Sequence, residues 1–197
     1  MKKFLFAILF CLGIVSNAVA QDTPKAAIQS TIDALVQVAE SKPGDANSAA
    51  RRSAMMDVIT PRFDFAEMAK SSLNRFWKER TPEEQKEFVD VFTALLAKTY
   101  LNRIDSIERD MVKVTADKVS GNRGIVKTTV NYKSDVFPID YRMVQKDGVW
   151  RVYDVVIENI GLVANYRNEF AGIIRKKQFS GLLADLKAKV NKKTEDK

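Results

Sequence analysis

Residues 81–104, TPEEQKEFVDVFTALLAKTYLNRI, predict a long amphipathic helix around which the rest of the fold can be arranged. Thr81 is a suitable N-cap, Pro82 fits the first helical position, and Glu84 stands where its side chain can bond back to the cap. Apolar side chains then recur at helical spacing over about six turns. This stripe is formed by Phe88, Val91, Phe92, Leu95, Leu96, Thr99, Tyr100 and Ile104.

After Ile107 the apolar residues change from helical spacing to the two-residue alternation of strands. Ser120-Gly121-Asn122 forms the first turn, and Asp147-Gly148 is a strong signal for a tight hairpin. The sequence therefore predicts four antiparallel strands in a meander. They cover residues 112–117, 126–132, 137–143 and 150–156.

Helices are predicted before and after these strands. The first starts at Asp22-Thr23-Pro24 and stops at Lys42-Pro43-Gly44, and the second runs from Ala46 to Ile59 with Arg51 and Arg52 on its outer side. A short helix starts at Asp64, and two helices close the chain. This order predicts one α+β domain over residues 21–197, with helices on one face of a curled four-stranded sheet.

The first twenty residues predict a secretory signal peptide. Lys2-Lys3 precedes an apolar run from Phe4 to Val15, and Ala18-Val19-Ala20 has the small-residue pattern of a cleavage site. The run has about twelve residues, whereas a spanning helix needs about twenty. Cleavage after Ala20 would remove Cys11, the one cysteine, and leave a mature chain from Gln21 without cysteine or histidine.

The residues missing from the predicted mature chain exclude several kinds of chemistry. Without cysteine and histidine there is no disulfide, no Cys- or His-based zinc site, no Cys nucleophile and no Ser-His-Asp triad. Among the acids, Asp140, Asp154 and Glu158 lie on strands, but none forms a pair at a spacing typical of acid/base catalysis. An enzyme is therefore not favoured.

The positive charge of the chain has two interpretations. The full sequence carries +7, and loss of the two leader lysines lowers this to +5. Basic clusters such as Arg175-Lys176-Lys177 are typical of a solvated face, but they also favour attraction to anionic lipid headgroups or acidic partner surfaces.

The predicted long helix and sheet either fill the space between them or enclose a cavity. The inner face of the sheet carries Tyr132, Phe137, Tyr141 and Trp150, opposite the aromatic stripe of the helix. Such stripes are normal for a core between a helix and a sheet, so the pattern alone leaves both possibilities open. The last strand is apolar on both faces near Val155 and Ile157, which predicts that both faces are covered there.

Two blocks of sequence resemble the MlaC family, also called the toluene-tolerance family. The first comprises residues 61–69 (PRFDFAEMA), Phe76-Trp77 and residues 81–88 (TPEEQKEF), with Phe92 and Thr99-Tyr100. The second comprises residues 150–155 (WRVYDV), Glu158, Leu162-Val163, Asn165-Tyr166-Arg167, Phe170 and residues 181–186 (GLLADL). The similarity follows the family's order over nearly the whole predicted mature chain.

The resemblance implies a periplasmic phospholipid carrier with an NTF2-like cone, a monomer that holds acyl chains inside and leaves the headgroup in water. It implies two membrane partners, an outer-membrane lipoprotein and porin assembly and an inner-membrane ABC transporter with an MCE-domain subunit. It implies no cofactor, no metal and no enzymatic activity. One departure is visible: Glu158-Asn159-Ile160-Gly161 stands where the family usually has Glu-Gly-Val-Ser, so Gly161 replaces a serine N-cap.

On this interpretation the acyl chains lie between the long helix and the sheet, with three further side chains at the side of the pocket. The predicted lipid-binding residues are Phe65, Met68, Phe76, Phe92, Leu95, Leu96, Tyr100, Tyr132, Phe137, Ile139, Tyr141, Met143, Trp150 and Val152. Three alternatives remain open: a carrier of hopanoid or another hydrophobic ligand, an NTF2-like small-molecule enzyme using Asp140 or Asp154 with Tyr141, and an adaptor that binds no ligand.

Overall fold

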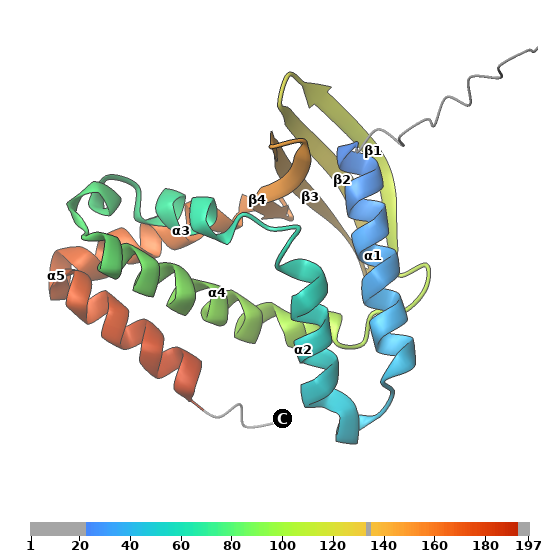
Figure 1. The fold of residues 1–197 in the computed structure, drawn as a ribbon, viewed down its shortest axis with the longest axis horizontal. Coiled ribbons are helices and arrows are strands. Elements are labelled where there is room, and N and C mark those ends of the chain that lie inside the picture. The colour runs from blue at the N-terminus through green and yellow to red at the C-terminus, as the bar shows by residue number, and fades with distance from the viewer. Residues whose placement is uncertain (1–22, 133–134, 193–197) are drawn as a thin grey trace, which may run out of the picture.

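A computed structural model describes residues 23–132 and 135–192 and shows an α+β fold (Figure 1). The predicted signal peptide and Cys11 lie outside these residues. Two short 3-10 helices, η1 (Asp45–Asn47) and η2 (Asn74–Glu79), join the longer helices. No helix in the described ranges combines the length and the apolar character that crossing a membrane requires. The α-helices are α1 (Pro24–Ser41), α2 (Ser48–Ile59), α3 (Phe65–Leu73), α4 (Pro82–Ile104) and α5 (Leu162–Asn191).

The described strands form one antiparallel sheet in the order β1-β2-β3-β4-β5, so the prediction of four strands was wrong by one. The additional strand β5 pairs with the end of β4 across a turn in which Glu158 and Asn159 have positive φ angles of 48° and 68°. A strand of two residues is too short to show alternation, which is why the sequence did not predict it. The strands are β1 (Val112–Ser120), β2 (Arg123–Tyr132), β3 (Asp135–Lys146), β4 (Val149–Ile157) and β5 (Ile160–Gly161).

Three of the predicted helix starts, those of α1, α3 and α4, are confirmed by their capping contacts, whereas α2 begins at Ser48 and not at Ala46. The Thr81 hydroxyl accepts a hydrogen bond from the Glu84 amide at 3.2 Å, and the Glu84 carboxylate accepts one from the Thr81 amide at 3.0 Å. Thr23 and Asp64 cap α1 and α3 through their side chains. These contacts satisfy amides that have no partner within their own helices.

The start of α5 is capped from the neighbouring strand. Gly161 occupies the N-cap position without a side-chain contact, but the carboxylate of Asp154 on β4 accepts a hydrogen bond from the Val163 amide at 3.0 Å. Asp154 also pairs with Arg142 at 3.0 Å. The two predicted closing helices form one element, α5, which breaks at Gln178, where φ is 62°.

The prediction that Arg51 lies on the outer side of its helix was wrong. Arg51 is only 8% exposed and forms two hydrogen bonds with the carboxylate of Asp105, at 2.7 and 2.8 Å. Its guanidinium also donates to the backbone carbonyls of Lys42 and Gly44. A buried arginine is tolerated where its donors are satisfied in this way, and sequence spacing does not reveal such long-range partners.

Two groups of buried residues form the interior. The first, which we call the aromatic core, lies among α3, α4 and α5 and is dominated by Phe88, Phe92, Tyr166, Phe170 and Phe179. The second, which we call the sheet core, lies mainly between α1, α2 and the sheet. It includes Ile28, Met55, Val126, Met143, Trp150 and Val152. Figure 1 shows α4 running from the first region, beside α3 and α5, towards α1 and α2.

Candidate functional site

An apolar cavity of about 190 Å³ lies where the aromatic core and the sheet core meet. Its walls come from α1, α2, α3, the second half of α4, the strands β3 and β4, and the first residue of α5. None of the described lining residues is charged. They are Ile28, Thr31, Ile32, Leu35, Met56, Ile59, Phe63, Phe65, Met68, Leu96, Ala97, Tyr100, Leu101, Ile104, Ile139, Tyr141, Val155, Ile157 and Leu162.

The two halves of α4 have different surroundings. Phe88 and Phe92 in the first half are fully buried, and their rings contact Phe170 at 5.8 and 5.9 Å between centroids. In the second half, Leu96, Tyr100 and Ile104 line the cavity. A single apolar stripe therefore fills a core at one end of the helix and borders empty space at the other.

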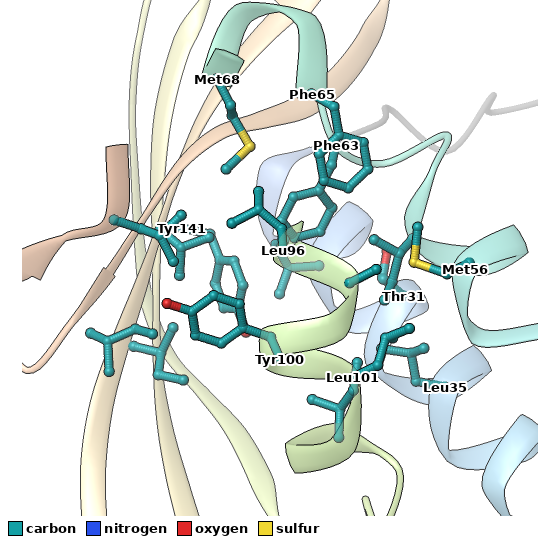
Figure 2. A pocket seen from close by; sticks show the side chains of 18 of the residues that line it. Thr31, Leu35, Met56, Phe63, Phe65, Met68, Leu96, Tyr100, Leu101 and Tyr141 are labelled. Atoms are coloured by element: carbon teal, nitrogen blue, oxygen red, sulfur yellow. The ribbon is translucent and has the colours of Figure 1, made fainter. Parts of the chain in front are cut away.

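Figure 2 shows how the other elements close around this half of α4. Thr31 and Leu35 on α1, with Met56 on α2, lie on one side of the cavity, and Tyr100 and Tyr141 lie on the other. Phe63 and Phe65 stack on each other with centroids 5.6 Å apart. The walls thus combine flexible thioether and aromatic surfaces, which can adapt to apolar ligands of varied shape.

The hydroxyl groups at the cavity lie beside other polar groups. Thr31 donates to the Ala27 carbonyl at 2.7 Å, the Tyr141 hydroxyl lies near Thr128, and the Tyr100 hydroxyl lies near Tyr166. Burial raises the pKa of Tyr141 to about 12, an effect that the Thr128 contact partly offsets. Tyr141 lines the cavity, so its high pKa agrees with a dry, apolar space.

Six of the predicted lipid-binding residues line this cavity: Phe65, Met68, Leu96, Tyr100, Ile139 and Tyr141. The apolar spacing on α3, α4 and β3 was therefore sufficient to predict that these six residues lie around one space. That any of them contacts lipid stays a prediction.

The other eight lie elsewhere. Phe92 and Leu95 are buried in the aromatic core, whereas Met143, Trp150 and Val152 are buried in the sheet core. Phe137 is half-buried on β3, and Tyr132 is 39% exposed at the end of β2. Phe76 borders a second, polar cavity at the break in α5, together with Arg80, Arg175 and Gln178.

A bulge on β4 affects which side chains reach the cavity. Arg142 pairs with Asp154 and Met143 with Val152, so Tyr153 has no partner on β3 and Val155 comes to the same face as Val152. The alternation of β3 continues regularly from Tyr141 to Met143, and Met143 lies further along that face, inside the sheet core. Bulges of this kind redirect side chains, and apolar alternation in the sequence does not reveal them.

Sequence reasoning missed the contributions of α1 and α2 to the cavity. Ile28, Ile32 and Leu35 lie on the first predicted helix, α1, but the sequence did not identify the elements against which this helix packs. The apolar residues Val155 and Ile157, which predicted cover on both faces of β4, do line the cavity. The apolar character of both faces of β4 was therefore a sequence signal for lining residues beyond the predicted set.

The carboxylates considered for catalysis do not line the cavity. Asp154 is held by Arg142 and by the amide of Val163, and Asp140 lies 4.0 Å from Lys127. Because Asp140 and Tyr141 are adjacent on a strand, their side chains point to opposite faces of the sheet. The arrangement required by the enzyme hypothesis is not present among the described residues.

Comparison with known proteins gives one consistent family. Residues 28–188 match the model of the MlaC protein family. The chain is 21% identical to the intermembrane phospholipid transport system binding protein MlaC of Haemophilus influenzae, over 94% of this chain and 92% of that protein. It is 26% identical to the toluene tolerance protein ttg2D of Pseudomonas putida, over 89% of this chain and 83% of that protein.

A solved structure supports the same grouping. The phospholipid-binding protein from Ralstonia solanacearum, determined in complex with a phospholipid, superposes with a TM-score of 0.75 at 26% identity. The match covers 84% of this chain and 95% of that chain. The family resemblance expected from the sequence is confirmed.

Proposed function

The chain belongs to the MlaC family, and on this premise we propose that it binds phospholipid and carries it through an aqueous compartment. The apolar cavity between α4, α1, α2 and the sheet is the observation that carries this proposal. It lies in a fold shared with a protein solved with phospholipid bound. The acyl chains would occupy the cavity, and the headgroup would remain in water.

The physical case for a carrier rests on the cost of exposing acyl chains. Two chains bring about 30 methylene groups, and each costs about 0.8 kcal/mol in water, so exposure costs over ~20 kcal/mol. Transfer from a bilayer into an apolar cavity exchanges one apolar environment for another and is close to neutral. The direction of transport must therefore be set by partners and not by this chain.

We extend the proposal to location and partners. The predicted signal peptide would deliver the chain to the periplasm with cleavage after Ala20. There it would act as a monomer that exchanges lipid with an outer-membrane lipoprotein and porin complex and with an inner-membrane ABC transporter that bears an MCE-domain subunit. The fold would work as an NTF2-like cone around the lipid, without enzymatic activity.

A hopanoid or another polycyclic lipid is the nearest alternative cargo, because uncharged, largely apolar walls favour hydrocarbon in general and not a particular lipid. The identity of the extracted lipid distinguishes these cargoes.

The experiment is mass spectrometry of an organic extract from protein purified without detergent. We expect a phospholipid in the extract. An empty apolar cavity costs about 24 cal/mol per Å³, so about 190 Å³ corresponds to on the order of 4 to 5 kcal/mol. Delipidated protein should therefore melt at a lower temperature and recover on adding phospholipid. An extract without lipid, together with a melting temperature that does not change on adding phospholipid, would contradict the proposal. It would favour the alternative of an adaptor that binds no ligand.

A further inference from the structure

The cavity is too small for a two-chain lipid in its present shape. An apolar cavity of about 150 Å³ accommodates one benzene molecule, so about 190 Å³ has room for on the order of eight carbon atoms. A phospholipid with two chains brings roughly 30 methylene groups to be buried, at about 0.8 kcal/mol each. Uptake of such a lipid therefore requires at least one wall of the cavity to move.

The walls differ in how firmly they are packed. Helix α1 buries seven residues, from Pro24 to Val36, mainly against the sheet, and α4 is held by the aromatic core. In α2, by contrast, only Arg51 and Met55 are buried. An element with few buried apolar side chains opens at lower free energy than its neighbours, so α2 is the wall that moves most easily.

Helix α2 has one fixed end. Immediately after it, the backbone of residues 62–64 pairs with β4: the Asp64 amide donates to the Val152 carbonyl, and the Val152 amide donates to the Arg62 carbonyl, both at 2.8 Å. The Arg62 guanidinium adds a hydrogen bond to the Trp150 carbonyl. These contacts attach the C-terminal end of α2 to the sheet.

The other end of α2 is held mainly by Arg51, and Arg52 adds a longer contact, 3.8 Å between its guanidinium and the carboxylate of Asp105. Arg51 forms its two hydrogen bonds with Asp105 at the end of α4, and it donates to the carbonyls of Lys42 and Gly44 in the connection from α1. Gly44 in that connection has φ of 80° and open space around its α-carbon, so the backbone can pivot there. Met56 and Ile59 of α2 face the cavity.

We propose that α2 is the wall that moves to admit lipid, and that the Arg51–Asp105 pair is the latch that keeps it closed. The proposal rests on the proposed function as a lipid carrier. The sheet attachment at residues 62–64 acts as the fixed end, and the connection at Gly44 swings when the latch breaks. Opening then exposes Met56 and Ile59 and enlarges the cavity towards the space that α2 occupies.

Uptake rates of variants provide the first test. Delipidated Arg51→Met, Asp105→Asn and the double variant are mixed with vesicles of phosphatidylethanolamine and phosphatidylglycerol that contain a fluorescent two-chain phospholipid. We expect each single variant to take up the lipid about tenfold faster than the unmodified protein, equivalent to about 1.4 kcal/mol. Because both changes break the same pair, the double variant should be no faster than about the faster single variant.

Two controls separate a latch from a general loss of structure. Arg109→Met removes the same kind of side chain from an exposed pair with Glu40, which does not involve α2, and should leave uptake unchanged. Octanol, with eight carbons, fits the cavity without opening, so its affinity should be the same in all variants. Uptake at the unmodified rate in both latch variants, or an equal change in octanol affinity, would overturn the proposal.

Hydrogen exchange on the unmodified protein gives a second test that does not depend on any variant. The amides of α2 should exchange at least about tenfold faster than those of α1 and of the second half of α4, and bound phospholipid should change exchange in α2 most. Equal protection of the three helices would contradict the proposal that α2 is the moving wall.

The uptake experiment distinguishes failure of the two proposals. If neither the unmodified protein nor any variant takes up lipid, the proposed function fails. Normal uptake with no effect of the latch variants removes this inference alone.

Discussion

The two ends of α4 show how one amphipathic helix can fill a core at one end and border a cavity at the other. Around Phe88 and Phe92, helices α3 and α5 approach closely and aromatic rings fill the space between them. Around Leu96, Tyr100 and Ile104, the neighbours are α1, α2 and the sheet, and a cavity remains. The residue types are similar at both ends, so the difference arises from what surrounds the helix.

Matched truncations should show this difference most strongly. Phe170→Ala removes a fully buried ring from the aromatic core and should lower the free energy of unfolding by about 3 to 5 kcal/mol. Phe65→Ala removes the same atoms from a half-buried ring at the cavity and should cost less than about half as much. Urea denaturation measures both values. Equal losses would mean that the cavity wall is packed as tightly as the core.

A smaller effect is expected at the start of α5, where this helix joins the sheet. Asp154→Asn weakens the contact with Arg142 and with the Val163 amide and should cost about 1 to 3 kcal/mol in urea denaturation. Adding Gly161→Ser supplies a local cap and should recover up to about 1 kcal/mol. Lipid binding should persist in both proteins. An unchanged stability in Asp154→Asn would show that this cap contributes little.

The smallest effect concerns pH and the dryness of the cavity. The pKa of Tyr141 is raised to about 12 by burial, so its contribution to stability is fully present below about pH 10 and is lost as the pH rises towards 12. Tyrosinate absorbance should show a transition near pH 12 that is smaller in Tyr141→Phe, and the part that remains belongs to Tyr166, whose pKa burial also raises to about 12. A transition of Tyr141 near pH 10 would mean that water fills the cavity.

The elements of the fold could be predicted from local sequence. Caps at Thr23, Asp64 and Thr81, the Asp147-Gly148 hairpin and the change from helical to alternating spacing are short-range signals that tertiary contacts do not override here. Strand β5 could not be predicted because two residues carry no periodicity. The buried position of Arg51 could not be predicted because its partner is 54 residues away.

The site was predicted less completely than the fold. Amphipathic spacing identifies the buried face of an element, but it does not distinguish a side chain that fills space from one that borders a cavity. Leu95 and Leu96 are adjacent on α4, and each side chain is only 6% exposed. Of the two, only Leu96 lines the cavity. Which side chains border the space depends on the bulge at Tyr153 of β4 and on the paths of α1 and α2.

The central claim, that lipid occupies the cavity beside the second half of α4, is tested most directly by the phospholipid bound to a matched pair of folded variants. Ile139→Asp places a charge on the cavity wall, whereas Ile125→Asp places the same charge at a side chain of β2 that is 37% exposed and does not line the cavity. Mass spectrometry with protein quantification should find lipid lost from Ile139→Asp and retained in Ile125→Asp, with both proteins folded by circular dichroism. Phospholipid at the unmodified ratio in folded Ile139→Asp would contradict the claim and place the lipid elsewhere.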